Sequence, residues 1–386
     1  MRVLFVTSKS LGGSGKYIEV AARGFKNAGL ECELIYFAQG DAQDQTIEEP
    51  FDAVSYLPVA PSFNPVGIIK NAAFIGKLVR GAEFDIVHTH TSFGGLLGRI
   101  GVAFFARNKV KIVHTLHAFG ADEFTPQPQK TLYWIIERFL DLVTDRYICP
   151  SHYMRLYGAK TRVVSPEKCR VVYNSLPLTA PPPEALRLEA SQRLRSRLNI
   201  VDSCCFLFCG RLERQKGLET LLAAFAKLLD RSSVNADLII CGSGEDELAL
   251  KKLASSLRIS ERVHWQGWQS DLTDFYSAAD VYVMPSRWES FGLVFLEAMN
   301  YSLPILSTKT QAIPEVVEDG VIGLLSPVDF IDDLEVNMFR LFADPDLRRR
   351  MGGAGLVRSK TLFSYDGFIK SHIEVYEEVL AEREGN

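Results

Sequence analysis

The sequence predicts an α/β protein with two doubly wound domains, each a parallel sheet covered by helices on both faces. Short runs rich in Val, Ile and Phe alternate with amphipathic segments along almost the whole chain. Such near-continuous apolar strands are typical of parallel sheets that are buried on both sides. A proline-rich stretch at residues 177–183 interrupts this pattern, which then begins again.

The first domain is expected over residues 1–176 and the proline-rich linker over 177–188. Two of the segments between its strands have helical spacing, Lys16–Ala28 and Thr131–Thr144. The strands predicted in this domain are Arg2–Thr7, Glu31–Phe37, Asp85–His90, Lys111–Leu116, Arg146–Pro150 and Arg170–Tyr173.

The second domain is expected over residues 189–362, followed by a C-terminal helix within 363–386. Apolar residues recur at helical spacing through Asp366–Arg383. Ligands of doubly wound sheets bind beyond the carboxyl ends of the strands, and in two such domains those ends can face each other across a cleft. The strands predicted in this domain are Cys205–Cys209, Leu238–Cys241, Val263–Gln266, Val281–Met284 and Ile305–Ser307.

The composition is that of an ordinary globular protein. Hydrophobic residues make up 47% and charged residues 23% of the 386 residues, which excludes a disordered or collagen-like chain. The seven cysteines are odd in number and form no C-x-x-C pair, so we expect no disulfide framework or zinc finger. No stretch reaches the ~20 apolar residues of a membrane span, and the first residues do not resemble a signal peptide. A cytoplasmic protein is therefore expected.

Charge is unevenly distributed along the chain. Residues 1–170 carry 20 Lys and Arg against 16 Asp and Glu, whereas residues 171–386 carry 23 against 31. The excess of cations in the first part suits an anionic partner. It is too weak for nucleic acid, which we do not expect as a partner.

A glycine-rich segment, Ser10–Tyr17, follows the first predicted strand and opens a helix. Gly12 and Gly13 let the backbone come close to a phosphate or sugar at a helix N-terminus, where N–H groups favour an anion. The segment is not a P-loop, because Ser10 stands where that motif requires Gly and Tyr17 where it requires Ser or Thr. The alternative is a tight turn without a ligand.

A second loop, Gly210–Gly217, lies between an apolar strand and a helix. Arg211 follows the strand directly and Lys216 comes five residues later, so both can reach a ligand at the end of the sheet. Two fixed cations suit a diphosphate, because its oxygens pair strongly with guanidinium and ammonium groups. The alternative is an ordinary solvated loop.

A third segment holds two carboxylates in unusual surroundings. Glu297 is the only charged residue in the apolar run Phe291–Met299, and a carboxylate there is costly unless it is hydrogen-bonded. Ribose hydroxyls would supply such bonds, whereas a surface helix with two solvated glutamates fits the apolar run poorly. Glu289 lies just before this helix. The backbone amides exposed beside it are those of Phe291, Gly292 and Leu293.

Four histidines lie at the ends of two predicted strands, in His88-Thr-His90 and His114-Thr-Leu-His117. The H-x-H spacing places two imidazoles on one strand face, where they can bind a metal. No set of Asp or Glu ligands accompanies them, so we expect no metal. His117 alone, at the end of its strand, can instead contact a substrate.

In the order and spacing of these motifs, the chain resembles the retaining glycosyltransferases of the large "glycosyl transferases group 1" family. These enzymes have the GT-B fold and use sugar nucleotides, and the resemblance covers essentially the whole length. Further matching motifs are Gly242-Ser-Gly244-Glu245, Asp280 before a strand, Ile313-Pro314-Glu315 and Asp319-Gly320.

The resemblance implies roles for the matching residues. Arg211 and Lys216 would hold the donor diphosphate, Glu297 the ribose and Glu289 the transferred sugar. The terminal helix would cross back to the first domain. The implied catalytic set is His117, Arg211, Lys216 and Glu289. The implied donor-binding set is Gly12, Gly13, Arg211, Lys216, Phe291, Gly292, Leu293 and Glu297.

The implied reaction is transfer of a sugar from a nucleoside diphosphate, with UDP the commonest carrier, to an acceptor hydroxyl with retained configuration. No D-x-D metal site is evident, so cationic side chains and helix amides are expected to stabilise the departing diphosphate without a metal or other cofactor. Two alternatives stay open: a sugar-nucleotide epimerase or phosphorylase on the same fold, and a catalytically silent sugar-nucleotide-binding protein. Ser302 and Thr310–Ala312 stand where relatives carry glycine, and we expect both near strand ends of the second domain, so they bear on donor identity more than on the class of reaction.

Two segments of the first domain, Pro65–Arg80 and Gly94–Lys111, are apolar and carry cations without any acid. This composition is typical of interfacial segments on anionic lipid. The expected acceptor is therefore a lipid-linked glycan of the cell envelope or of an exopolysaccharide, extended by a peripheral enzyme at the inner face of the plasma membrane. The alternative is that both segments are core helices whose cations extend to the surface.

Overall fold

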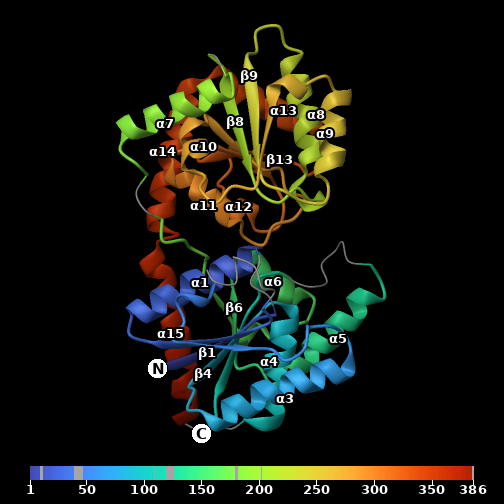
Figure 1. The fold of residues 1–386 in the computed structure, drawn as a ribbon, viewed down its shortest axis with the longest axis vertical. Helices are drawn as coiled ribbons and strands as arrows, with labels where there is room; N and C mark the ends of the chain where they lie inside the picture. The colour runs from blue at the N-terminus through green and yellow to red at the C-terminus, as the bar shows by residue number, and fades with distance from the viewer. Residues whose placement is uncertain are drawn as a thin grey trace. The chain divides into compact units, whose positions relative to one another are not determined.

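The computed structural model describes residues 1–8, 12–38, 47–107, 109–118, 126–178, 181–200 and 202–384. The chain divides into two compact units (Figure 1). Unit 1 comprises Met1–Pro177 and Tyr365–Asn386, and unit 2 comprises Leu178–Ser364. Each unit contains a parallel sheet with helices between its strands, so the predicted class, two doubly wound α/β domains, is confirmed.

In the described part of unit 1, seven parallel strands form one sheet in the order β3-β2-β1-β4-β5-β6-β7. The order reverses between β1 and β4, and ligands of such sheets bind at this switch point, beyond the carboxyl ends of the strands. In chain order the strands are β1 (Arg2–Val6), β2 (Glu31–Tyr36), β3 (Ala53–Tyr56), β4 (Ile86–His90), β5 (Lys111–Thr115), β6 (Arg146–Cys149) and β7 (Cys169–Val171).

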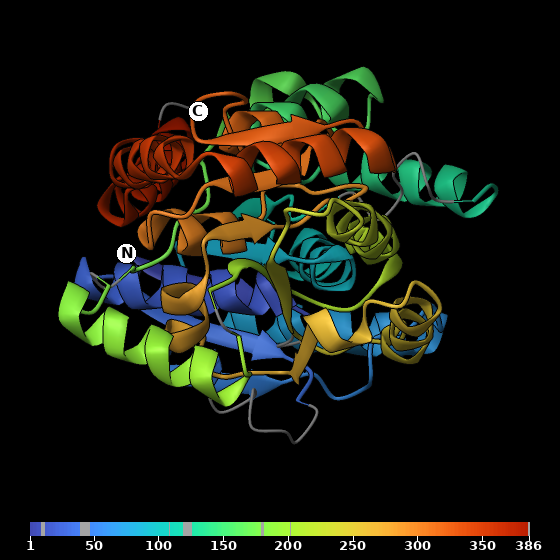
Figure 2. The ribbon, with the colours of Figure 1, turned by 90° about the horizontal axis from the view of Figure 1, so that it is seen from above.

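Helices cover both faces of this sheet. Successive residues of a strand point to opposite faces, and Val87 packs in the core cluster under α3 and α4 while His88 contacts Tyr376 of α15. Helix α15 also packs against α1, and α5 lies at the edge of the unit in both views (Figures 1 and 2). The helices are α1 (Gly12–Asn27), α3 (Pro65–Gly81), α4 (Ser92–Phe105), α5 (Gln129–Asp141), α6 (His152–Lys160), η1 (Pro166–Lys168) and α15 (Tyr365–Glu384).

Unit 2 repeats this plan with six parallel strands among its described residues, in the order β10-β9-β8-β11-β12-β13. Its switch point lies between β8 and β11, which pair directly through Val281 and Phe206. In chain order the strands are β8 (Cys204–Cys209), β9 (Ala236–Cys241), β10 (Val263–Gly267), β11 (Val281–Val283), β12 (Ile305–Thr308) and β13 (Gly323–Ser326).

Figure 1 shows helices α8, α9 and α13 on one side of this sheet and α7, α10, α11 and α14 on the other. These helices are α7 (Glu184–Arg197), α8 (Leu218–Leu229), α9 (Glu247–Ser256), α10 (Thr273–Ala278), α11 (Leu293–Asn300), α13 (Ile331–Ala343) and α14 (Pro345–Thr361). Shorter elements are η2 (Arg214–Lys216), η3 (Ser260–Arg262) and α12 (Ile313–Val316). Helix α7 begins at Glu184, so the last residues of the predicted linker are helical. Proline is tolerated before a helix but not inside one, and Glu184 follows the last of three prolines.

Helix α4 corrects one sequence expectation. The segment Gly94–Lys111 was expected to present its cations to a lipid surface, but Arg99 is fully buried and forms a 2.9 Å ion pair with Glu137 of α5. The cause is the glycine content of the helix. A Cβ at Gly94 would lie 2.6 Å from Cα of Thr7, so α4 approaches β1 too closely for any side chain at that position. Most of α4 is therefore core.

All seven cysteines are free, and six of them are buried. Among the described helices, none combines the length and the apolar character that a bilayer span requires.

Candidate active site

The two loops predicted to bind the donor both lie at the switch point of unit 2. One follows β8 and contains η2, and the other follows β11 and leads into α11. They are hydrogen-bonded to each other: the Arg287 N–H donates to the Gln215 carbonyl at 2.8 Å, and the Gln215 side-chain amide donates to the Trp288 carbonyl at 2.9 Å. The structure therefore brings these two motifs together.

Two glycines make this close approach possible. Gly217 has φ +67°, and a Cβ there would lie 2.1 Å from the carbonyl oxygen of Pro285. Gly242, in the loop after β9, has φ +144°, and its Cβ would lie 1.8 Å from the carbonyl oxygen of Gly210. Only glycine combines these dihedral angles with this lack of space, so three neighbouring loops pack backbone against backbone.

Lys216 and Glu289 form an ion pair across the two loops. The Lys216 Nζ atom lies 2.6 Å from Glu289 Oε2, and the two side chains are only 13% and 11% exposed. The backbone N–H of Glu289 donates to the side-chain oxygen of Gln311 at 3.0 Å, and the Glu289 carbonyl accepts from the Ala312 N–H at 3.2 Å. Glu289 is thus fixed through its backbone and its carboxylate.

Glu297, on α11, accepts a hydrogen bond of 2.8 Å from the hydroxyl of Tyr276 on α10. The Tyr276 ring is buried and stacks on Tyr301, with ring centroids 5.2 Å apart. Burial and the neighbouring Glu297 charge raise the pKa of the Tyr276 phenol well above its ordinary value, so it stays protonated and donates. Glu297 is not an exposed surface carboxylate, as its apolar surroundings in the sequence indicated.

A cavity of about 250 Å³ opens at the carboxyl ends of the strands of unit 2. Both Arg211 and Glu297 line it, while the Arg211 side chain is 62% exposed and pairs with Glu213 at 2.7 Å. The other lining residues are Cys209, Gly210, Cys241, Gly242, Ser243, Trp268, Gln269, Leu272 and Val294.

Sequence reasoning missed two residues of this cavity, Trp268 and Gln269, and gave no role to Ser243 of the Gly242–Glu245 motif. All three follow strands, and Trp268 is 63% exposed directly after β10. A large aromatic side chain at the carboxyl end of a strand was the signal that could have found it, because ligands gather at that edge.

Ser302 and Gln311, from the two segments where relatives carry glycine, share an unusual backbone conformation. Ser302 and Gln311 both have positive φ, +57° and +45°, a conformation that glycine adopts without cost. Gln311 lies at the donor side, where it binds the backbone of Glu289. Ser302 precedes β12 and its carbonyl faces Gly352 of α14, so it lies at the amino end of that strand, opposite the edge where ligands of such sheets bind.

In unit 1, Gly12 and Gly13 begin helix α1 after β1, at the carboxyl edge of the sheet. Residues 9–11, including Ser10 of the predicted motif, lie outside the described residues. A Cβ at Gly13 would meet no atom within 4 Å, so packing does not require glycine there. A role in ligand binding stays a prediction.

His117 lies in a buried group of aromatic side chains. Its Nε2 is 3.1 Å from Nδ1 of His90, and its ring meets Tyr17 edge-on with centroids 4.7 Å apart. Burial lowers the pKa of His117 to about 3, so its imidazole is neutral at physiological pH. His117 is therefore suited to hydrogen bonding and not to proton donation.

The other histidines of the group are engaged by hydroxyls. Nδ1 of His88 lies 2.6 Å from the Tyr376 hydroxyl, and its Nε2 lies 2.7 Å from Thr115. Nδ1 of His114 lies 2.8 Å from Thr89. Within the described ranges, no three His, Cys, Asp or Glu side chains converge as a metal would require.

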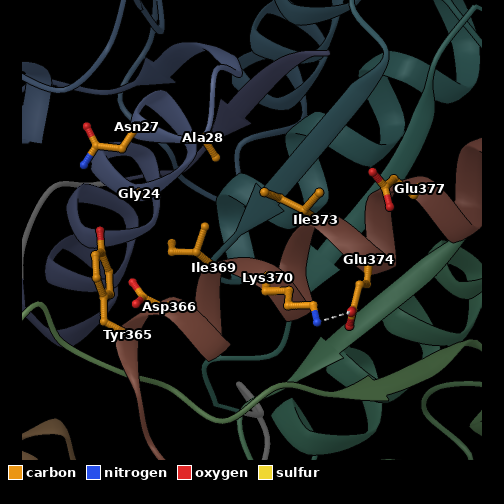
Figure 3. Close-up of a pocket in the computed structure, with 10 residues that line it drawn as sticks. All are labelled: Gly24, Asn27, Ala28, Tyr365, Asp366, Ile369, Lys370, Ile373, Glu374 and Glu377. Carbon is orange, nitrogen blue, oxygen red and sulfur yellow. Dashed lines mark ion pairs between the residues drawn. The ribbon is translucent and has the colours of Figure 1, made fainter. Parts of the chain in front are cut away.

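A larger cavity, about 540 Å³, lies in unit 1 between α1 and α15 (Figure 3). It opens beside Gly24, where a Cβ would come within 2.1 Å of Ile369, and the Lys370–Glu374 ion pair of α15, at 3.8 Å, lines it. Its residues on α1 come from the end of that helix, which lies at the amino edge of the sheet. Because ligands bind at the opposite edge, its size does not make it the active site.

Comparison with known proteins agrees with this geometry. The family model "Glycosyl transferases group 1" matches residues 191–357, and "Glycosyltransferase Family 4" matches residues 11–179. The D-inositol 3-phosphate glycosyltransferase of Streptomyces bingchenggensis is 32% identical over 404 residues, covering 96% of this chain and 85% of the relative. The chain belongs to the glycosyl transferases group 1 family.

Two further comparisons concern this glycosyltransferase. A UDP-Gal:α-D-GlcNAc-diphosphoundecaprenol α-1,3-galactosyltransferase of Escherichia coli is 28% identical, covering 72% of this chain and 71% of the relative. Among solved structures, HepE of Anabaena in complex with UDP-glucose superposes with a TM-score of 0.81 at 20% identity, covering 98% and 100% of the two chains. The predicted GT-B fold is confirmed by this likeness.

Proposed function

We propose that this glycosyltransferase moves a sugar from a UDP-sugar to an acceptor hydroxyl with retention of configuration at the anomeric carbon. The observation that carries the proposal is the cavity at the switch point of unit 2, which both Arg211 and Glu297 line. A cation and a carboxylate within one cavity suit a ligand with both a diphosphate and ribose hydroxyls. UDP is the choice that the Anabaena and Escherichia coli relatives favour.

Arg211 and Lys216 stabilise the departing diphosphate in this proposal. Negative charge grows on that group as the glycosidic bond breaks, and charges fixed in advance near it lower the barrier. Glu289 holds Lys216 at 2.6 Å, so its ammonium group is in place before the donor binds. The backbone amides of Phe291 to Leu293, at and just before the start of α11, add partial positive charge at a helix N-terminus.

In this proposal Glu297 binds the ribose and Glu289 contacts the transferred sugar. The Tyr276 hydroxyl donates a hydrogen bond to Oε2 of Glu297, so the carboxylate is held in one orientation when the donor binds. In unit 1, His117 and Gly13 are proposed to bind substrate. As a neutral imidazole, His117 accepts or donates a hydrogen bond to a sugar hydroxyl.

The acceptor is proposed to be a lipid-linked glycan at the inner face of the plasma membrane, in the synthesis of a cell-envelope or exocellular polysaccharide. The Escherichia coli relative supports this choice, because its name specifies a diphosphoundecaprenol-linked sugar as its acceptor.

The test is release of nucleotide from a panel of UDP- and GDP-sugars, with and without a short sugar diphosphate lipid as acceptor. We expect fast release of UDP from a UDP-sugar only when acceptor is present. The coupling of the anomeric proton in the product should match that of the anomeric proton in the donor. EDTA should leave the rate unchanged. Inverted coupling would refute retention, and loss of activity on chelation that added metal restores would refute a cation-only mechanism. Absence of transfer to any lipid-linked sugar would refute the proposed acceptor.

A further inference from the structure

Helix α5 exposes an apolar stripe that no described residue of unit 1 covers. The side chains of Leu132, Ile135, Phe139 and Leu142 are between 49% and 70% exposed. They follow one another at intervals of three, four and three residues, so they form one continuous stripe along the helix. The helix lies at the edge of the unit, in teal in Figures 1 and 2.

The opposite face of α5 fixes the helix to the unit. Glu137 is buried and pairs with Arg99 at 2.9 Å, and Leu140 is buried one turn further on. Trp134 packs against the core cluster around Tyr147. The exposed stripe is therefore held outward by a rigid attachment.

The charge around the stripe is positive. Of the two acids on α5, Glu137 is buried, and Asp141 accepts hydrogen bonds from the Ser165 N–H and hydroxyl at 3.0 and 2.6 Å. Arg138 is exposed and, within the described residues, has no acidic partner. Arg107 donates to the Val143 carbonyl at 2.7 Å, just beyond the end of the helix.

A hollow of about 460 Å³ lies at this end of the stripe. Leu142 supplies an apolar wall, and Arg138 and Arg162 both line it, together with Asp141 and the backbone near Ser165. The adjoining helix α6 has no acid in its sequence and exposes Leu156 between two exposed cations, Arg155 and Lys160. Apolar and cationic side chains thus alternate across this surface, with Glu167 on η1 as an exposed acid at its margin.

We propose that α5 and this hollow dock unit 1 on an anionic phospholipid bilayer. The apolar stripe enters the boundary between headgroups and acyl chains, and Arg138 and Arg162 bind lipid phosphate. The proposal rests on the proposed function in one respect, since a lipid-linked acceptor requires the enzyme to work at a bilayer. A second copy of this chain is the poorer occupant, because a twofold contact would set these cations against one another.

The experiment measures binding of the full-length protein to vesicles of phosphatidylcholine alone or mixed with phosphatidylglycerol, at low and at high salt. We expect binding to the anionic vesicles that falls as salt rises. The double variant Ile135→Ser with Phe139→Ser should bind the anionic vesicles about tenfold more weakly or worse, because less apolar surface is buried in the bilayer. Arg138→Gln and Arg162→Gln should each lower it about fivefold at low salt and flatten the salt dependence.

Matched controls separate the surface from general effects. Leu186→Ser with Leu188→Ser removes two exposed apolar side chains from α7 of unit 2, and Arg349→Gln removes an exposed cation from α14. These variants should bind vesicles as the wild type does. All variants should keep the wild-type melting temperature and its increase with UDP, because none touches the core or the donor site.

Four results would overturn the proposal. The first is no binding of the wild type to anionic vesicles at low salt, and the second is equal binding by the Ile135/Phe139 variant. The third is a dimer in solution that this variant dissociates, which would make the surface a protein interface. The fourth is a wild-type protein that binds inorganic phosphate at Arg138 and Arg162 but does not bind vesicles. Vesicle binding without sugar transfer would instead refute the proposed function and leave this surface standing.

Discussion

Tyr276 donates a hydrogen bond of 2.8 Å to Glu297 from a ring that is almost wholly buried. The tyrosine does not line the donor cavity, whereas the carboxylate does. A residue outside the cavity therefore decides how a residue inside it is oriented. The phenol keeps its proton because its pKa is raised by burial, so the bond persists across the physiological pH range.

Replacing Tyr276 by Phe should weaken binding of UDP by about tenfold, since a hydrogen bond to a charged group is lost. The turnover number at saturating donor should change little, because the ribose contact is equally strong in ground and transition states. Calorimetry with UDP and steady-state kinetics measure the two effects. Tyr301→Phe is the control, because it alters the ring that stacks on Tyr276 and leaves the hydrogen bond from Tyr276 to the Glu297 carboxylate in place. Equal affinities in both variants would contradict a positioning role.

Replacing Lys216 by Ala should affect stability as well as turnover. Glu289 would be left as an unpaired carboxylate that is only 11% exposed, which should cost about 3 kcal/mol of unfolding free energy. Turnover should fall by about 10² to 10³. The double variant Lys216→Met with Glu289→Gln should recover much of the stability in urea unfolding and none of the activity. Recovery of turnover in the double variant would show that the lysine acts only through the fold.

Replacing Arg211 by Ala should lower turnover by about 10² to 10³ without affecting stability. Its side chain is 62% exposed, and its ion pair with Glu213 is a surface contact of little worth. Urea unfolding and donor kinetics measure the two properties separately. Near wild-type turnover with the true donor would remove Arg211 from the site.

The positive φ angles of Ser302 and Gln311 give a paired prediction. Ser302→Gly should raise the free energy of unfolding by about 1 kcal/mol, because the strained conformation is released, and leave turnover unchanged. Gln311→Gly releases similar strain but removes the 3.0 Å bond to the Glu289 N–H, so turnover should fall about fivefold. Thermal unfolding and kinetics on both variants provide the check, and an equal loss of turnover in the two would contradict the assignment of Ser302 to the far edge.

Acid should destabilise unit 1 through its buried histidines. Burial lowers the pKa of His372 to about 4, whereas an unfolded histidine titrates near 6.5. Between these values the unfolded state binds a proton that the folded state does not, so stability is lost as pH falls from about 6.5 to 4. The loss for His372 alone is about 3 kcal/mol. Burial lowers the pKa of His88, His90 and His114 in the same direction.

Urea unfolding at pH 7 and pH 5 tests this dependence on two variants. His372→Gln should be less stable than the wild type at pH 7, because its contact with Tyr17 is weakened, but should lose less stability on acidification. His152→Gln, an exposed residue of the same unit, should keep the full acid sensitivity. The same loss in both variants would place the acid effect elsewhere.

The sequence predicted the central strands well because they are buried on both faces and therefore apolar throughout. It missed β3, Ala53–Tyr56, which is an edge strand with exposed residues at both ends and gives no such run. It also missed β13, a strand of four residues at one edge of the sheet of unit 2. Short edge strands depend on a neighbour for their conformation, and a neighbour is not visible in local sequence.

The site was predictable to a similar degree and for a similar reason. Glu297 was recognisable because a lone carboxylate in an apolar run needs a partner, but the partner, Tyr276, lies on another helix. Arg99 was misjudged as a surface cation for the converse reason, since its buried partner Glu137 is 38 residues away. Pairings between distant segments are set by the packing of whole elements, which periodicity alone does not specify.

The course of the chain through the two units affects the order in which they can fold during synthesis. Unit 2 is one continuous segment, Leu178–Ser364, whereas unit 1 needs both the beginning and the end of the chain. His372 and Tyr376 reach Tyr17 and His88 only after the last helix has left the ribosome. Until then the nascent chain exposes the apolar face of β4 and α1 that α15 will cover, while unit 2 already has its full sequence. Chains truncated before Tyr365 therefore lack the means to complete their first domain, although every residue of that domain's sheet has been synthesised.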